Sequence, residues 1–395
     1  MDMGTLRAWW AHRQGLDGSL SGASPADVLE RCGWARSVGG VGPYLTLFSR
    51  AGTSRENADA AVAALQIHEL PTARGCTYVV PANDFALGLS VGAAFNGGEM
   101  KQAIKLGVTE KEIAALCDAV VKALARGPLD PDGIRSATGS ASRSLGDAGK
   151  KKGLTTTLPL ALGELQSTGK IRRVPVNGRL DQQRYAYALW KPNPLSGYRA
   201  SPADSHRLLA EHFFRWIGPA KMSHFQWFSG LGVAASKAAA TELDLTPIAE
   251  GSEWLLLQED LASFKKFRAP AKAQYALVSS LDPIVANRRD VASHVDAADA
   301  ERQVMGEKAT ATLGALSDLP SHAILDRGRV VGLWEFDPET QTIAAATFVP
   351  KTKALDAAIE ATEGFVRDQL GDARSFSLDS PKSRMPRIAA LRKER

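Results

Sequence analysis

One short run of polar side chains has the residue types needed for acid-base chemistry. The run reads Gln66-Ile67-His68-Glu69 and is followed by Pro71. A histidine can exchange protons near neutral pH, and a glutamate can orient a water molecule, so His68 and Glu69 are the candidate catalytic residues. The competing interpretation places both residues at the end of a helix, where one of them makes a cap or an ion pair.

The basic segment 150–190 is a second group of residues that could bind a partner. It holds eight Lys or Arg against Glu164 and Asp181, so its net charge is 8 − 2 = +6, which exceeds the +5 of the whole chain. Residues 382–395 hold six basic residues against Glu394, a net of 6 − 1 = +5. Residues 356–372 carry five acids and one arginine. The molecule is therefore expected to present separate basic and acidic surfaces, although a solvated face plus a frayed basic tail would give the same pattern.

The basic segment belongs to a series of predicted helices that ends in a hairpin. Thr109 and Glu112 form a capping-box pattern before an amphipathic helix that ends near Gly127. A second short helix is expected over 130–137, and a third carries leucines at helical spacing over 158–165. The apolar period then changes to two residues on either side of Asn177-Gly178, which predicts a β-hairpin over 171–189. Three helices followed by a hairpin are typical of a winged helix.

The same order of elements recurs about 92 residues later, counted along the sequence. A helix opening at Ser201-Pro202 is followed by helices near 222–228 and 233–243 and by a hairpin over 245–258. The first hundred residues hold a degenerate third copy, with a helix over 54–65 and a strand over 75–81. Beyond Pro270 short strands and one helix over 354–370 indicate a barrel-like domain. We expect an α+β fold with winged-helix domains at 1–105 (divergent), 106–198 and 199–270, and a β-barrel-like domain with a basic tail at 271–395.

Five short segments follow one another along the chain in a distinctive order. They are Pro43-Tyr44-Leu45-Thr46-Leu47-Phe48, Arg74 through Asp84, Phe228-Ser229-Gly230-Leu231, Leu281-Asp282-Pro283 and Gly328-Arg329-Val330-Val331-Gly332. Through these segments and their order, the chain resembles the tandem winged-helix DNA glycosylases that excise bulky alkylated purines and unhook interstrand crosslinks. The resemblance implies winged helices arranged around duplex DNA and a C-terminal β-barrel.

The sequence departs from this family where the family's catalytic motif would stand. The resemblance implies Gln-x-Gln or Gln-x-Asp shortly before the Pro-Tyr segment, to position the water that attacks the sugar. Residues 34–42 contain neither a glutamine nor a carboxylate. Enzymatic activity therefore depends on His68 and Glu69, whereas Asp282 is expected to cap a turn before Pro283.

The winged-helix interpretation assigns DNA contacts to residues of the basic segment. The third helix of such a domain enters the major groove, so Thr155, Thr156 and Gln166 are expected to face base edges. Residues that pair with phosphates fix the position of the protein on DNA without reading the base sequence. If six such residues engage, the logarithm of the DNA-binding constant falls against the logarithm of the salt concentration with a slope of about −5. These six are Lys150, Lys151, Lys152, Arg172, Arg173 and Arg179. A merely solvated wing is the competing interpretation.

Composition narrows the class of protein. With 395 residues, 44% hydrophobic and 23% charged, the chain has the composition of a globular protein of several domains. No apolar run approaches the ~18 residues of a membrane span and no secretory signal is visible, so a cytoplasmic location without membrane partners is expected. Three cysteines without metal-type spacing predict neither disulfides nor a metal site, and no cofactor is expected. The helical or strand positions of most tryptophans suit a core: Trp9, Trp10, Trp34, Trp216, Trp227 and Trp254.

We expect a protein that binds double-stranded DNA and is related to DNA repair glycosylases. Its expected activity is the excision of bulky alkylated bases. A rival hypothesis is a non-catalytic DNA-binding protein such as a transcriptional regulator. A third uses the winged helices for protein contacts only.

Overall fold

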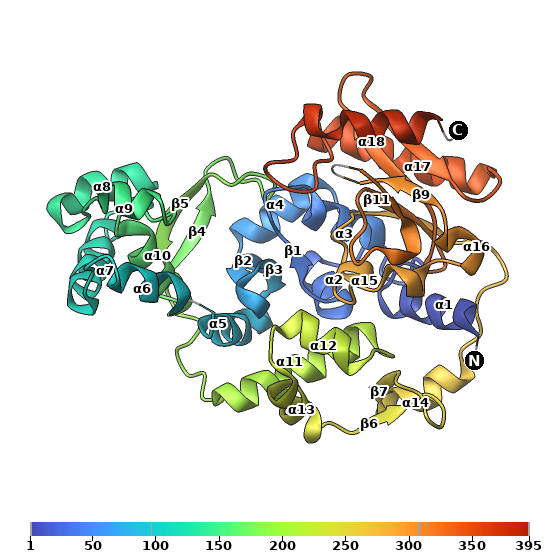
Figure 1. Cartoon of the computed structure of the whole chain (residues 1–395), viewed down its shortest axis with the longest axis horizontal. Helices are drawn as coiled ribbons and strands as arrows, with labels where there is room; N and C mark the ends of the chain where they lie inside the picture. The colour runs from blue at the N-terminus through green and yellow to red at the C-terminus, as the bar shows by residue number, and fades with distance from the viewer. Residues whose placement is uncertain (1, 96, 307–308, 394–395) are drawn as a thin grey trace.

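The computed structural model of the chain describes residues 2–95, 97–306 and 309–393. The N-terminal part places a small antiparallel sheet of order β1-β3-β2 between two hydrophobic cores (Figure 1). Ile67 and Val79 face one core, and Leu70 and Tyr78 face the other. Its elements are α1 (Met3–Arg13), α2 (Pro25–Cys32), β1 (Ala35–Arg36), α3 (Gly42–Ala51), α4 (Arg55–Ala63), β2 (Ile67–Pro71), β3 (Thr77–Pro81) and α5 (Phe85–Ala93).

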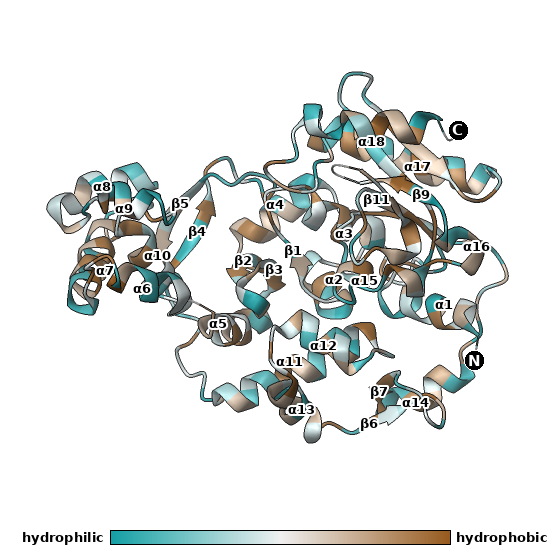
Figure 2. Ribbon diagram, viewed as in Figure 1, coloured by the Kyte–Doolittle hydropathy of each residue, from teal (hydrophilic) through white to brown (hydrophobic). Residues whose placement is uncertain are grey.

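The helix predicted over 54–65 and the strand predicted over 75–81 are confirmed as α4 and β3. The placement of His68 and Glu69 at a helix end is wrong. Leu65 adopts a left-handed backbone with φ of 56°, which ends the helical path, and the chain then pairs with β3 as strand β2. Figure 2 shows hydrophilic as well as hydrophobic residues along β2 and β3, although the sheet packs against a core on each side.

Residues 97–189 form a helical unit and a hairpin around a core of their own, set at one end of the molecule in Figure 1. The predicted capping box is confirmed, because Thr109 accepts from the Glu112 amide and Glu112 accepts from the Thr109 amide. The predicted helices and hairpin are present, with a short extra helix inside the basic loop. The elements are α6 (Gly97–Ile104), α7 (Glu110–Leu124), α8 (Pro131–Thr138), α9 (Gly146–Lys150), α10 (Leu158–Ser167), β4 (Ile171–Pro175) and β5 (Tyr185–Leu189).

The next segment repeats three helices and a hairpin, as its sequence predicts. Ser201 caps the first helix in a capping box with Asp204. The elements are α11 (Pro202–Ile217), α12 (Met222–Ser229), α13 (Val233–Thr241), β6 (Leu245–Pro247), β7 (Leu255–Leu257) and α14 (Gln258–Lys266). The core of this segment is shared with β2, β3 and α5, so the repeat packs directly on the N-terminal sheet.

The C-terminal part contains an open antiparallel sheet of order β13-β12-β11-β8, so the expected barrel is wrong for the part of the chain described. Helices cover both faces: α3 and α17 pack on one side, and α1 and α18 on the other, so the sheet buries its apolar residues without closing. The elements are β8 (Tyr275–Val278), α15 (Pro283–Ala286), α16 (Ala297–Ala300), β9 (Gln303–Met305), β10 (Thr310–Thr312), β11 (His322–Asp326), β12 (Arg329–Asp337), β13 (Thr342–Thr347), α17 (Lys353–Phe365, extended by a π-helical turn Val366–Leu370) and α18 (Pro381–Lys393).

The basic end of the chain is an ordered helix and not a frayed tail as far as Lys393. Arg384 and Arg387 of α18 are buried, and Arg387 donates to Glu335 and Asp379, each at 2.8 Å. Arg384 pairs with Asp372 at 2.6 Å. Much of the positive charge counted in this segment is therefore neutralised inside the protein. No helix among the described residues is both long and apolar enough to cross a membrane.

Candidate functional site

A cavity of about 420 Å³ opens where the N-terminal sheet, α12 and the loops of the C-terminal part meet. Its lining comes from segments far apart in the sequence: 36–38, 74–78, Trp227, 280–287, 318–320, 375–376 and Arg387. Two of the segments that carry the family resemblance contribute to it: 74–84 through Arg74 and Tyr78, and 281–283 through Leu281. The cavity is therefore the place where the fold gathers these segments.

The two sheet residues of the lining are held by strand register. Arg36 on β1 lies directly opposite Tyr78 on β3, so both side chains point to the same face of the sheet. The Arg36 guanidinium carbon lies 5.4 Å from the centre of the Tyr78 ring. A cation over an aromatic ring is stabilised by the negative face of the ring.

Trp227 of α12 contacts two guanidinium groups. The guanidinium carbons of Arg74 and Arg289 lie 3.5 Å and 4.1 Å from the centre of the indole ring. Arg289 also pairs with Asp318 across 2.9 Å, and the Asp318 side chain is 50% exposed. The lining thus combines a flat aromatic surface, cations and one solvent-accessible carboxylate.

Two of the lining arginines keep an uncompensated charge. In residues 2–95, 97–306 and 309–393, no carboxylate lies within 4.0 Å of the nitrogen atoms of Arg36 or Arg74. Arg387, in contrast, is paired with two carboxylates. The cavity therefore favours a ligand that offers an aromatic face together with hydrogen-bond acceptors or negative charge.

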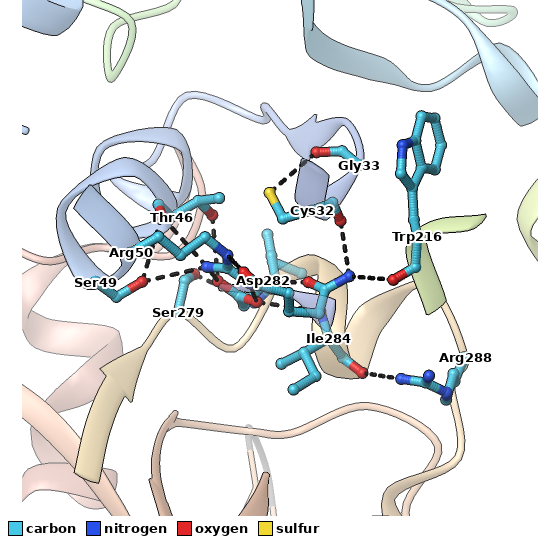
Figure 3. A network of polar contacts seen from close by, with 12 residues as sticks. Cys32, Gly33, Thr46, Ser49, Arg50, Trp216, Ser279, Asp282, Ile284 and Arg288 are labelled. Carbon is cyan, nitrogen blue, oxygen red and sulfur yellow. Dashed lines mark hydrogen bonds and ion pairs between the residues drawn. The ribbon is translucent and has the colours of Figure 1, made fainter. Parts of the chain in front are cut away.

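A buried ion pair, drawn in Figure 3, lies next in the sequence to Leu281, which lines the cavity. Arg50 of α3 donates to both carboxylate oxygens of Asp282, at 2.7 Å and 2.8 Å, and both side chains are fully buried. Burial disfavours the charged guanidinium, but the Asp282 carboxylate outweighs it and raises the pKa of Arg50. Asp282 also accepts from the Ile284 amide at 3.1 Å, which confirms its predicted capping role at α15. The ion pair joins α3 to the segment that supplies Leu281 and Asn287 to the lining.

The structure does not place His68 or Glu69 in the cavity lining. The His68 ring is buried between Phe85 and Trp190, and neither of its nitrogens has a hydrogen-bond partner in the described structure. Burial, with a smaller contribution from Arg172 and Arg173, lowers the pKa of His68 to about 3. The catalytic role assigned to it stays a prediction.

Glu69 lies on the opposite face of β2 from His68. It accepts a hydrogen bond from the Ser37 hydroxyl, and burial raises the pKa of its carboxyl group above the usual value. Its catalytic role also remains a prediction, and it would require access that the buried side chain lacks in this conformation.

The candidate DNA-binding residues have different surroundings. Lys150, Lys151 and Lys152 are exposed at the end of α9, and Lys150 lies 3.6 Å from Asp147. The two threonines precede α10; Thr155 is exposed and Thr156 is half-buried. These five residues are free to meet a ligand at the surface.

The other candidates are less accessible. Gln166 is buried and donates to the Leu162 carbonyl at 3.1 Å. Arg172 and Arg173 are half-buried on β4. Arg179 pairs with Asp181 and donates to the Leu370 carbonyl at 3.0 Å, so it already has internal partners. Contact of any of these nine residues with DNA remains a prediction.

Sequence reasoning did not identify Arg36, Trp227 or Asp318 as site residues. Trp227 was expected in a core, and it is half-buried at the cavity, whereas Trp9, Trp10, Trp34 and Trp216 are buried as predicted. A signal existed for Trp227, because it directly precedes a segment of the family resemblance. Asp318 lies in a loop without a pattern, so only the fold reveals its position.

Comparison with known proteins identifies the family of the chain. Residues 41–365 match the model of a protein family described as DNA glycosylase AlkZ-like. The structure is similar to that of the Streptomyces sahachiroi DNA glycosylase AlkZ, with a TM-score of 0.69 and 17% sequence identity over 95% of this chain and 98% of that one. No curated protein sequence matches the chain. Because the family match spans most of its length, the chain belongs to the AlkZ-like DNA glycosylase family.

Proposed function

We propose that this protein binds double-stranded DNA and excises bulky alkylated bases. In this proposal 106–198 and 199–270 act as winged-helix domains, 1–105 is a divergent third copy, and 271–395 is the domain that completes the cavity. A cytoplasmic location is part of the proposal, because DNA is the expected substrate. The order of helices and hairpin in both repeats supports the assignment of the winged-helix domains.

The observation that carries the proposal is the composition of the cavity. Its volume of about 420 Å³ lies within the range of sites for small organic groups, which gives room for a base with a bulky substituent. Trp227 and Tyr78 line it with aromatic rings, and Arg36 and Arg74, which lie over these rings and have no carboxylate partner in the described residues, suit the phosphates beside such a base. A base must leave the helical stack before a protein can act on it, and a cavity of this kind can receive it.

Asp318 is the carboxylate that this site offers for hydrolysis. Arg289 holds one of its oxygens, which leaves the other able to orient a water molecule toward the sugar carbon C1′. As water adds to that carbon, the glycosidic bond breaks and its electron pair passes to the base. A base with an N7-alkyl group loses its positive charge in this step, and the proton of the attacking water passes to the carboxylate. Neither His68 nor Glu69 is needed in this scheme.

A second candidate function is DNA binding without catalysis, as in a transcriptional regulator. It is favoured by residues 34–42, which lack the glutamines of the family and place Arg36 and Val38 at the cavity.

Incubation of the protein with a duplex that carries an N7-alkylguanine, followed by alkaline cleavage of abasic sites, separates the two functions. We expect strand breaks above the spontaneous background. Salt-sensitive binding of the same duplex without such breaks would support the regulator instead.

A further inference from the structure

Leu378 is the most exposed large hydrophobic residue in the part of the chain that the structure describes. It is 84% exposed, compared with 63% for Val176, the next in order. A single exposed leucine needs no explanation by itself, so its significance depends on how it is held and what surrounds it.

The loop that presents Leu378 is fixed on both sides of its tip. The Ser377 amide donates to the Val38 carbonyl at 3.0 Å, and the Ser375 amide donates to the Asp379 carboxylate at 3.2 Å. Asp379 is in turn buried against Arg387. The hydroxyls of Ser375 and Ser280 lie 2.9 Å apart. The backbone on both sides of the apolar tip is therefore anchored before any ligand binds, which lowers the entropy cost of using the tip for contact.

The same loop borders the cavity and the hairpin of the basic segment. Ser375 and Phe376 line the cavity, only two or three residues before Leu378. Arg374 donates to the Asp181 carbonyl at 2.7 Å, and Arg179 donates to the Leu370 carbonyl at 3.0 Å. The β4-β5 connection is thus packed against the base of the loop (Figure 1). Leu378 therefore lies on a loop that borders both the cavity and this hairpin.

Charge around the loop indicates a polyanion as the occupant. Asp372 and Asp379 are neutralised by Arg384 and Arg387. The exposed Lys382 follows the loop, and in the described residues it has no carboxylate within 4.0 Å, as is also true of Arg36 and Arg74. An apolar tip on a loop that borders a cavity with two unpaired arginines and is followed by an exposed lysine suits duplex DNA, whose phosphates meet the cations while the stacked bases meet the apolar group.

We propose that Leu378 inserts between stacked base pairs of bound duplex DNA and unstacks the base beside the cavity. Apolar wedges of this kind open base steps, and the opened base becomes available to the adjacent site. This inference rests on the DNA binding of the proposed function and adds the residue that opens the stack.

The test uses the full-length protein and a short duplex with 2-aminopurine, whose fluorescence rises when it leaves the stack. The variants are Leu378→Ala, Leu378→Phe and, as a matched control on an exposed apolar side chain far from the loop in Figure 1, Met3→Ala. We expect the wild type, Leu378→Phe and Met3→Ala to raise the fluorescence. Leu378→Ala should lose most of the rise and bind about tenfold more weakly, because an apolar side chain no longer becomes buried. Its salt dependence should stay that of the wild type, because the phosphate contacts remain.

Leu378 is so exposed that these variants should melt at the temperature of the wild type, which a thermal scan verifies. A full fluorescence rise and unchanged affinity for Leu378→Ala would overturn the wedge while leaving salt-dependent DNA binding, and so the proposed function, intact. Absence of binding by the wild type would overturn both.

Discussion

His68 shows how burial decides what a titratable residue does. Its type is suited to proton transfer, yet the ring is enclosed by Phe85 and Trp190 and makes no hydrogen bond in the described structure. A buried imidazole without hydrogen bonds destabilises the folded state because its nitrogens have lost their contacts with water. A protonated ring would destabilise it more, because a charge would then be buried. The residue type could be recognised in the sequence, but its strand and its neighbours could not, because they depend on pairing with β3 and on Trp190 far along the chain.

Replacement of His68 by leucine tests this environment. The pKa of His68 is lowered from its ordinary value of 6.5 to about 3 in the folded protein. Between these two pH values, His68 binds a proton in the unfolded chain but stays neutral in the folded protein. The contribution of His68 to stability is therefore complete above pH 6.5 and is lost as the pH falls, by about 1.4 kcal/mol per pH unit at most. Urea titrations should give His68→Leu a free energy of unfolding equal to or above that of the wild type at pH 7, and a shallower loss between pH 6 and pH 4.

A pH dependence of unfolding that is identical in the His68→Leu variant and the wild type would show that the ring is solvated. Loss of base release with unchanged stability would instead restore His68 as a catalytic residue.

The helices were the most predictable elements. The capping boxes at Thr109 and Ser201 mark helix starts through contacts within four residues, so the sequence alone is enough. The open sheet and α18 were not predictable in this way. Whether four strands close depends on the helices that cover them, and the buried arginines of α18 depend on acids such as Glu335 that lie about fifty residues away in the sequence.

The Arg50 and Asp282 ion pair joins α3 to the N-cap of α15 (Figure 3). Asp282→Ala leaves a buried guanidinium without its partner, so we expect a loss of about 3–5 kcal/mol in the free energy of unfolding. The matched control is Asp318→Ala, which breaks a half-exposed pair and should cost about 1 kcal/mol or less. Chemical denaturation measures both, and equal losses in the two variants would contradict the assigned role of the buried pair.

The distribution of charge over the whole molecule decides how DNA could bind. The sequence locates the basic segment, but only the fold shows that Arg179 and the arginines of α18 are already paired inside the protein. Lys150, Lys151 and Lys152 remain exposed at one end of the molecule, far from the start of α17 in Figure 1. The cavity likewise could be assembled only from the fold, since its walls come from segments up to about 350 residues apart in the sequence.

Replacement of the three lysines by alanine tests this surface. Each phosphate contact contributes about 0.9 to the slope of log K against log salt, so the triple variant should have a slope less negative by about 2–3. Lys351→Ala combined with Lys353→Ala removes exposed charge beside α17 and should leave the slope unchanged. Fluorescence anisotropy at several salt concentrations measures the slopes, and a wild-type slope in the triple variant would exclude this surface.

The proposed chemistry is tested most directly by single-turnover release of an N7-alkylated guanine from duplex DNA by the wild type, Asp318→Asn and Lys351→Ala. We expect release by the wild type and the lysine control, and a loss of roughly a hundredfold or more in Asp318→Asn, because one oriented carboxylate supplies an effect of this size. Binding of the duplex by Asp318→Asn should be as tight as that by the wild type. Equal release by the wild type and Asp318→Asn would contradict the assignment of the chemistry to this cavity.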